Sequence, residues 1–136
     1  MVAPQPYILF PGTAREALEH YRAVFGGDAE LVLHTYEEFG RDDGPADAIA
    51  HGMLRGPVDL YAADAASGER SVTVTGLMLS LLGAAEPATL HAWFAALADG
   101  GQVIDDLQER EWGASDGVVR DRFGLTWLIG HEGTSD

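Results

Sequence analysis

The feature that most constrains the fold of this 136-residue chain is an internal repeat of helix boundaries. Helix-start signals occur at Thr13 and Pro87, and glycine pairs that end a helix occur at Gly26-Gly27 and Gly100-Gly101. Both signals therefore recur after 74 positions. A recurrence at both ends of a helix indicates two similar supersecondary units in one chain.

The first helix is predicted after Thr13, which stands at a capping-box spacing from Glu16. Charged residues occupy one side of this segment, and apolar residues recur at helical spacing on the other. The predicted apolar side comprises Ala14, Ala17, Leu18, Tyr21, Val24 and Phe25. The second helix is predicted from Pro87 to the glycine pair at 100–101, with proline in its first turn.

One apolar strand precedes each predicted helix and three follow it. The first set covers residues 5–10, 29–39, 48–56 and 58–64, and the second covers 71–82, 102–112, 116–123 and 125–131. The pattern predicts an α+β fold of tandem βαβββ modules, at about residues 5–64 and 71–131, within a single domain spanning 1–136. The alternative is a ferredoxin-like α+β sandwich with extra strands.

Composition excludes several classes of protein. The net charge is −14, from 22 acidic and 8 basic residues, which argues against nucleic-acid binding because phosphate contacts need clustered cations. The sequence contains no run of 18 apolar residues, so no membrane span is predicted. It also contains no segment with the pattern of a secretory signal, so a cytoplasmic location is expected. With no cysteine, thiolate metal sites and disulfides are excluded.

Three segments carry a resemblance to a known superfamily: PYILFPGTAREALEHYRAVFGG, AIAHGMLRG and EREWGASDGVVRDRFGLTWLI. They resemble the PhnB-like, or 3-demethylubiquinone-methyltransferase-like, branch of the vicinal oxygen chelate superfamily, and the matches run from Pro6 to Ile129. This superfamily includes glyoxalase I, extradiol dioxygenases and bleomycin-binding proteins. The resemblance implies curved mixed sheets around a cleft, and it implies a homodimer.

In the metal enzymes of that superfamily, His, Gln or Glu on the first and last strands of each module bind a divalent metal. Counting from Gly124 places the last such position on Leu128, and by the repeat, counting from Gly56 places its partner on Leu60. The opening strands offer Tyr7, Ile8 and Leu9, and Leu77, Met78 and Leu79. Because aliphatic side chains cannot ligate a metal, no metal site or other cofactor is expected, with a divalent metal kept as the alternative.

The leading interpretation is therefore a glyoxalase/bleomycin-resistance-like protein that binds an apolar or aromatic small molecule without the usual metal ligands. His51 is its expected polar contact, although a buried histidine tied to a backbone carbonyl would look the same in sequence. The other lining residues are expected to be Leu9, Phe39, Met53, Leu60, Met78, Trp112 and Leu128. No catalytic residue is assigned.

Two enzymatic interpretations stay open. The first is a metal-dependent lyase or dioxygenase of glyoxalase type, with His51 and either Glu37 or Glu109 as ligands. The second is a methyltransferase, which the name of the branch suggests, but the sequence has no binding fingerprint for a methyl donor.

The remaining polar residues are interpreted as surface groups. Glu16 and His20 share a helix face, and His34 and Glu38 share a strand face, but neither pair has a third ligand in view. His91 and His131 are expected at the surface. The arginines near strand ends, Arg55, Arg120 and Arg122, are expected to pair with local acids.

Overall fold

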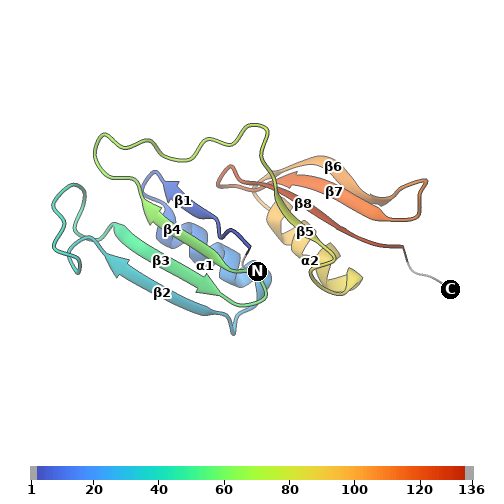
Figure 1. The fold of residues 1–136 in the computed structure, drawn as a ribbon, viewed down its shortest axis with the longest axis horizontal. Coiled ribbons are helices and arrows are strands. Elements are labelled where there is room, and N and C mark those ends of the chain that lie inside the picture. Colours follow the sequence, from blue (N-terminus) through green and yellow to red (C-terminus); the bar gives the residue numbers. More distant parts are fainter. Residues whose placement is uncertain (1–2, 134–136) are drawn as a thin grey trace. The chain divides into compact units, whose positions relative to one another are not determined.

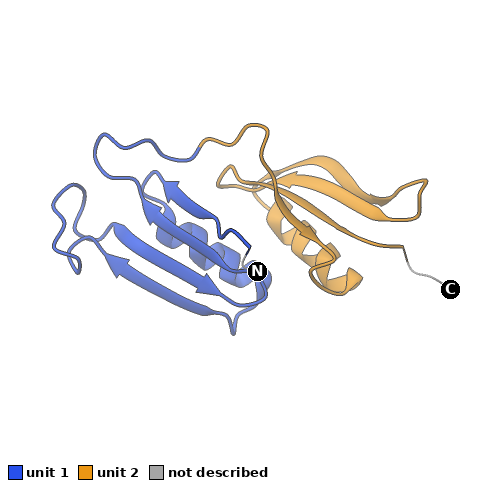
Figure 2. Ribbon diagram, in the orientation of Figure 1, with its two compact units in different colours: residues 1–72 blue, residues 73–136 orange. Residues whose placement is uncertain are grey.

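The computed structural model describes residues 3–133. The chain divides into two compact units, residues 1–72 and 73–136 (Figure 2). Each unit contains one strand, one helix and then three strands (Figure 1). The predicted α+β fold of tandem βαβββ modules is confirmed.

The first unit is a four-stranded mixed sheet with one helix. Its elements are β1 (Tyr7–Phe10), α1 (Ala14–Phe25), β2 (Glu30–Thr35), β3 (Ile49–Arg55) and β4 (Leu60–Asp64). The strand order is β1-β4-β3-β2, in which β1 pairs with β4 in parallel and the other pairs are antiparallel. The first and last strands of the module are therefore neighbours.

The second unit repeats this topology. Its elements are β5 (Leu79–Leu82), α2 (Pro87–Ala98), β6 (Gln102–Glu109), β7 (Ser115–Arg120) and β8 (Thr126–His131). The strand order is β5-β8-β7-β6, and β5 pairs with β8 in parallel. Both helices have 12 residues, as the repeated start and stop signals indicated.

Each core lies between a helix and one face of its own sheet. In the first unit α1 buries Ala14, Ala17, Leu18, Tyr21 and Phe25. In the second unit α2 buries Leu90, Trp93, Phe94 and Leu97, and the sheet contributes Val119, Trp127 and Ile129. One face of each sheet thus remains uncovered by its own helix.

The start of α1 differs from the capping-box prediction. The Thr13 side chain makes no capping hydrogen bond. Instead the backbone N–H of Ala14 donates to Oδ1 of Asp64, a buried carboxylate at the end of β4, at 2.9 Å. The negative charge stabilises the positive end of the helix from the strand next to β1, a contact that local sequence spacing does not reveal.

Two predicted strands are shorter in the structure. Residues 71–82 were expected to form one strand, but only Leu79–Leu82 does so, because Gly76 has a φ of 75° that interrupts an extended backbone. The strand expected over 29–39 ends at Thr35, and a turn follows in which Tyr36 is buried. Among residues 3–133, no helix is long and apolar enough to cross a membrane.

Candidate functional site

The face of the first sheet that α1 leaves uncovered carries most of the polar and aromatic candidates, and we call it the open face. Along β3, Gly52 and Leu54 are buried towards α1, whereas His51 and Met53 alternate with them on the other side. A Cβ atom on Gly52 would lie 2.6 Å from the side chain of Leu18 in α1. Glycine therefore lets the helix approach the sheet closely, and His51 points away from the helix.

Five ring-bearing side chains form a row across the open face, which we call the aromatic row: Tyr7, Tyr61, His51, His34 and Phe39. The ring centroid of His51 lies 5.6 Å from that of Tyr7 on β1 and 6.3 Å from that of Tyr61 on β4. On the other side, His34 of β2 lies 6.5 Å from His51, and Phe39 lies 5.3 Å from His34. All four ring pairs are stacked, so the row presents nearly parallel rings, four from neighbouring strands of the sheet and Phe39 from the turn after β2.

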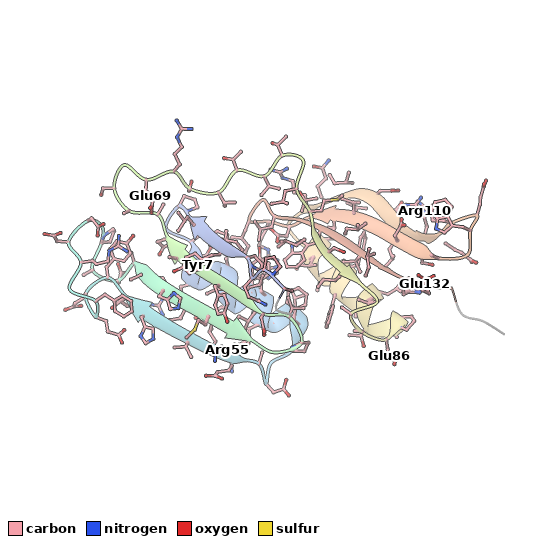
Figure 3. The ribbon with its side chains drawn as sticks, viewed as in Figure 1. Tyr7, Arg55, Glu69, Glu86, Arg110 and Glu132 are labelled. Atoms are coloured by element: carbon pink, nitrogen blue, oxygen red, sulfur yellow. The ribbon has the colours of Figure 1, made fainter. Side chains whose placement is uncertain are left out.

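Two hydrogen bonds hold the row. The Tyr7 hydroxyl and His51 Nδ1 are 2.9 Å apart, which leaves Nε2 of His51 for a ligand. Partial burial raises the pKa of the Tyr7 hydroxyl, so this phenol is neutral at physiological pH. Tyr7 begins β1, and Arg55 ends β3, the strand that carries His51 (Figure 3).

The second hydrogen bond joins His34 Nδ1 to Oε1 of Glu38, at 2.9 Å. Glu38 lies in the turn after β2, and its other oxygen accepts the backbone N–H of Thr35 at 3.2 Å. The His34 hydrogen bond, followed by the Thr35 one, lowers the pKa of the Glu38 carboxyl. The ionised carboxylate therefore fixes the His34 ring against Phe39.

The structure brings together most of the residues predicted in the first unit. His51, Met53 and Leu9 lie on the open face by strand alternation and register, and Phe39 is 52% exposed beside His34. Leu60 is misplaced by the sequence interpretation, because it faces α1 and is only 1% exposed. The residue of β4 that reaches the open face is its neighbour Tyr61.

The residues predicted in the second unit occupy different surroundings. Leu128 is half-buried on the side of β8 opposite Trp127 and Ile129, which face α2. Met78 precedes β5 and is 47% exposed, and Trp112 lies in the turn between β6 and β7 and is 73% exposed. Of these three predicted residues, only Leu128 lies on the uncovered sheet face.

The metal site that the resemblance implies would lie on the first and last strands of each unit. On the faces away from the helices, these strands carry Tyr7 and Tyr61 in the first unit and Ser80 and Leu128 in the second. None of the four is an imidazole or a carboxylate. Within residues 3–133, no group of three or more His, Cys, Asp or Glu side chains is arranged to hold a metal. The residues present at these strand positions therefore do not fit the superfamily's metal site.

The other acidic and basic candidates make structural contacts. Arg122 pairs with Asp99 at 3.3 Å, as expected for pairing with local acids. Arg55 instead donates to the Met53 sulfur at 3.5 Å. Arg110, which the sequence interpretation had not singled out, pairs with Asp105 at 2.6 Å and with Asp116 at 2.8 Å.

Solved structures of other proteins share this fold. No protein-family model matches the chain. The crystal structure of protein PA1353 from Pseudomonas aeruginosa is 32% identical, with 98% of this chain and all of that one covered and a TM-score of 0.79. A PhnB protein from Bacillus cereus is 20% identical over 96% of this chain and 99% of its own, with a TM-score of 0.77. A glyoxalase/bleomycin resistance protein from Albidiferax ferrireducens T118 is 16% identical over 95% and 98%, with a TM-score of 0.64.

The chain belongs to one family with PA1353 and has the vicinal oxygen chelate fold. Protein YjdN from Escherichia coli K12 is also similar, at 28% identity over 91% of each chain. The vicinal oxygen chelate fold accounts for the pairing of the first and last strands in both units. It does not decide the chemistry, because one fold hosts many functions.

Proposed function

We propose that this protein binds a planar apolar or aromatic small molecule on the open face of its first unit. The observation that carries the proposal is the aromatic row, in which five ring-bearing side chains stand nearly parallel on one uncovered sheet face. Aromatic walls with few polar groups are typical of small-molecule sites. The ligand would contact the rings together with Leu9 and Met53, and His51 would supply the polar contact.

Exposure of the rings supports the proposal. Tyr7 is 49% exposed and Phe39 is 52% exposed, although both are large apolar or amphipathic groups. An apolar ligand that covers these rings gains roughly 25 cal/mol of binding free energy for each Å² of apolar surface removed from water. The hydrogen bond between His51 and Tyr7 uses Nδ1 of the imidazole, so Nε2 can bind a polar atom on the ligand without breaking the row.

The rival function is a metal-dependent lyase or dioxygenase of glyoxalase type. Such an enzyme requires about three convergent nitrogen or oxygen donors on one metal. The open face offers two imidazoles, those of His34 and His51, and within residues 3–133 no group of three or more His, Cys, Asp or Glu side chains is arranged to hold a metal. We therefore favour the binding protein and propose that no resident cofactor is needed for it.

A screen of planar aromatic and apolar compounds by thermal shift, followed by calorimetry on the hits, tests the proposal. A true ligand should bind wild type, and His51→Ala and Phe39→Ala should each weaken the affinity by about tenfold or more. His91→Ala is the matched control, because it removes an exposed histidine from the other unit. Equal affinity in wild type and in both open-face variants would overturn the proposal.

We also propose that the protein forms a homodimer. Exposed apolar side chains in the second unit support this, since Val103 and Ile104 on the edge strand β6 are 40% and 55% exposed. Light scattering after size exclusion should give twice the chain mass of 14.5 kDa. Replacement of Ile104 by Lys should then shift the mass towards the monomer, and a monomeric wild type at every concentration would contradict the dimer.

A further inference from the structure

His91 and His131 form a pair in the second unit, whereas the aromatic row belongs to the first unit. Their Nε2 atoms are 3.1 Å apart, and their ring centroids are 5.3 Å apart with the planes tilted by 48°. The two residues are separated by 40 positions, so only the fold brings them together.

Packing of α2 on the second sheet creates the pair. Along β8, Trp127 and Ile129 are buried towards α2, and strand alternation places His131 on the same side at the end of the strand. His91 follows the buried Leu90 near the start of α2. The packing of α2 on β8 therefore brings both imidazoles together, although neither ring is fully buried.

The second ring nitrogen of His131 is also held. Nδ1 of His131 lies 2.9 Å from the backbone carbonyl oxygen of Glu132. A carbonyl oxygen only accepts, so Nδ1 carries the proton, and in the neutral ring Nε2 keeps a lone pair directed at His91. Histidines that bind metals commonly donate their other N–H to a carbonyl or carboxylate in this way.

The distance between the Nε2 atoms suits two ligands of one cation. Imidazole nitrogens bind Zn²⁺ at about 2.0–2.1 Å, so two adjacent ligands are about 2.9–3.4 Å apart for angles between octahedral and tetrahedral. The observed 3.1 Å lies inside this range. In a cation-bound form the His91 ring would carry its proton on Nδ1, which makes its Nε2 a ligand as well.

The surroundings of His131 suit a hydrated cation. A cavity of about 280 Å³ is bordered by His131 together with Asp116 and Glu132. Glu132 lies just past the end of β8 (Figure 3). The net charge of −14 adds a favourable long-range field for cations. Water from the cavity can occupy the coordination positions that two imidazoles leave open.

We propose that His91 and His131 are two ligands of a binding site for a divalent transition cation of the imidazole-preferring class, represented by Zn²⁺ and Cu²⁺. Water would occupy the remaining positions. This site lies at the start of α2 and the end of β8, not at the strand positions where the superfamily's metal enzymes carry their ligands. It is independent of the ligand site proposed on the open face.

Calorimetric titration of tag-free, chelator-treated protein with zinc chloride and copper chloride tests the site. Wild type should bind one equivalent, and His91→Ala or His131→Ala should weaken the affinity by about tenfold or more. His34→Ala and His51→Ala are matched controls that remove one histidine each from the first unit and should leave the affinity unchanged. Circular dichroism establishes that each variant is folded, and His91→Gln provides a second, more conservative change.

Imidazole NMR gives a readout that does not depend on the variants. Addition of zinc should shift the Nε2 resonances of His91 and His131 and leave those of His34 and His51 in place. Absence of binding to wild type, or binding that survives both substitutions, would overturn the site. Loss of binding in His51→Ala would also overturn it, and would support the metal-dependent enzyme instead.

Discussion

Trp127 donates its indole N–H to the carboxylate of Asp121 at 2.8 Å, and both side chains are at least 97% buried. The same carboxylate accepts the backbone N–H groups of Phe123 and Leu125. Asp121 therefore closes the turn between β7 and β8 and fixes the large ring that anchors β8 against α2. The acidic residue near the last strand serves the core, and β8 itself carries no carboxylate.

Replacement of Asp121 by Ala should destabilise the fold by about 3 kcal/mol, because three donors lose their acceptor in a largely buried site. Urea unfolding followed by tryptophan fluorescence measures the change. Asp99→Ala is the control, since that side chain is 82% exposed and should change stability by less than about 0.5 kcal/mol. Equal effects of the two substitutions would contradict the structural role of Asp121.

Replacement of Asp64 by Ala should cost about 2–4 kcal/mol, because the buried carboxylate accepts the N–H of Ala14 at 2.9 Å and that of Ile49 at 2.8 Å. Hydrogen exchange should show faster exchange at the start of α1 and the start of β3. Thr13→Ala is the control: its side chain makes no capping hydrogen bond, so the helix start should be unaffected. Greater sensitivity to Thr13 than to Asp64 would contradict the cap seen in the structure.

Substitution of Gly52 by Ala should destabilise the first unit by about 1–3 kcal/mol through overpacking against Leu18. Gly27→Ala is the matched control, because a Cβ atom there meets nothing within 4 Å. Thermal unfolding of the two variants measures the difference. A neutral Gly52→Ala would mean that α1 can move away from the sheet at no cost.

The Glu38 carboxyl should titrate below its ordinary pKa of 4.5, and His34→Ala should raise that pKa towards the ordinary value. A folded-state pKa below the unfolded one contributes stability above the unfolded pKa, and this is lost as pH falls through the folded pKa. Carboxyl NMR titration of Glu38 in wild type and His34→Ala checks the direction. His91→Ala should leave the titration unchanged, and an unshifted Glu38 in wild type would contradict the hydrogen bond.

The repeated fold could be predicted from sequence because its signals are local. Pro87 at the start of α2 and the glycine after each helix act through backbone geometry within a few residues. The strand expected over 71–82 was too long, because Val, Thr and Leu on both sides of Gly76 are typical of strands and only the conformation of Gly76 reveals the break. A single domain, a cytoplasmic location and the absence of a nucleic-acid partner stay predictions.

The placement of the candidate residues could be predicted in part, and their role in binding stays a prediction. Alternation along β3 correctly put His51 and Met53 on one face. Counting four residues from Gly56 placed Leu60 on the wrong face of the sheet, because Gly56 and Gly124 occupy different places in their turns. Gly124 has a φ of 88°, whereas the backbone N–H of Gly56 donates to the Asp59 side chain. The contact between His91 and His131 could not be found by local reasoning, since it depends on how α2 packs on β8.

The parallel pairing of β1 with β4, and of β5 with β8, makes each sheet complete within its own unit. In both units the first and last strands of the module are neighbours, and neither sheet borrows a strand from the other unit. A substitution that disrupts strand pairing in one unit therefore leaves the strand partners of the other unit in place. The aromatic row and the histidine pair, one in each unit, can thus be altered separately.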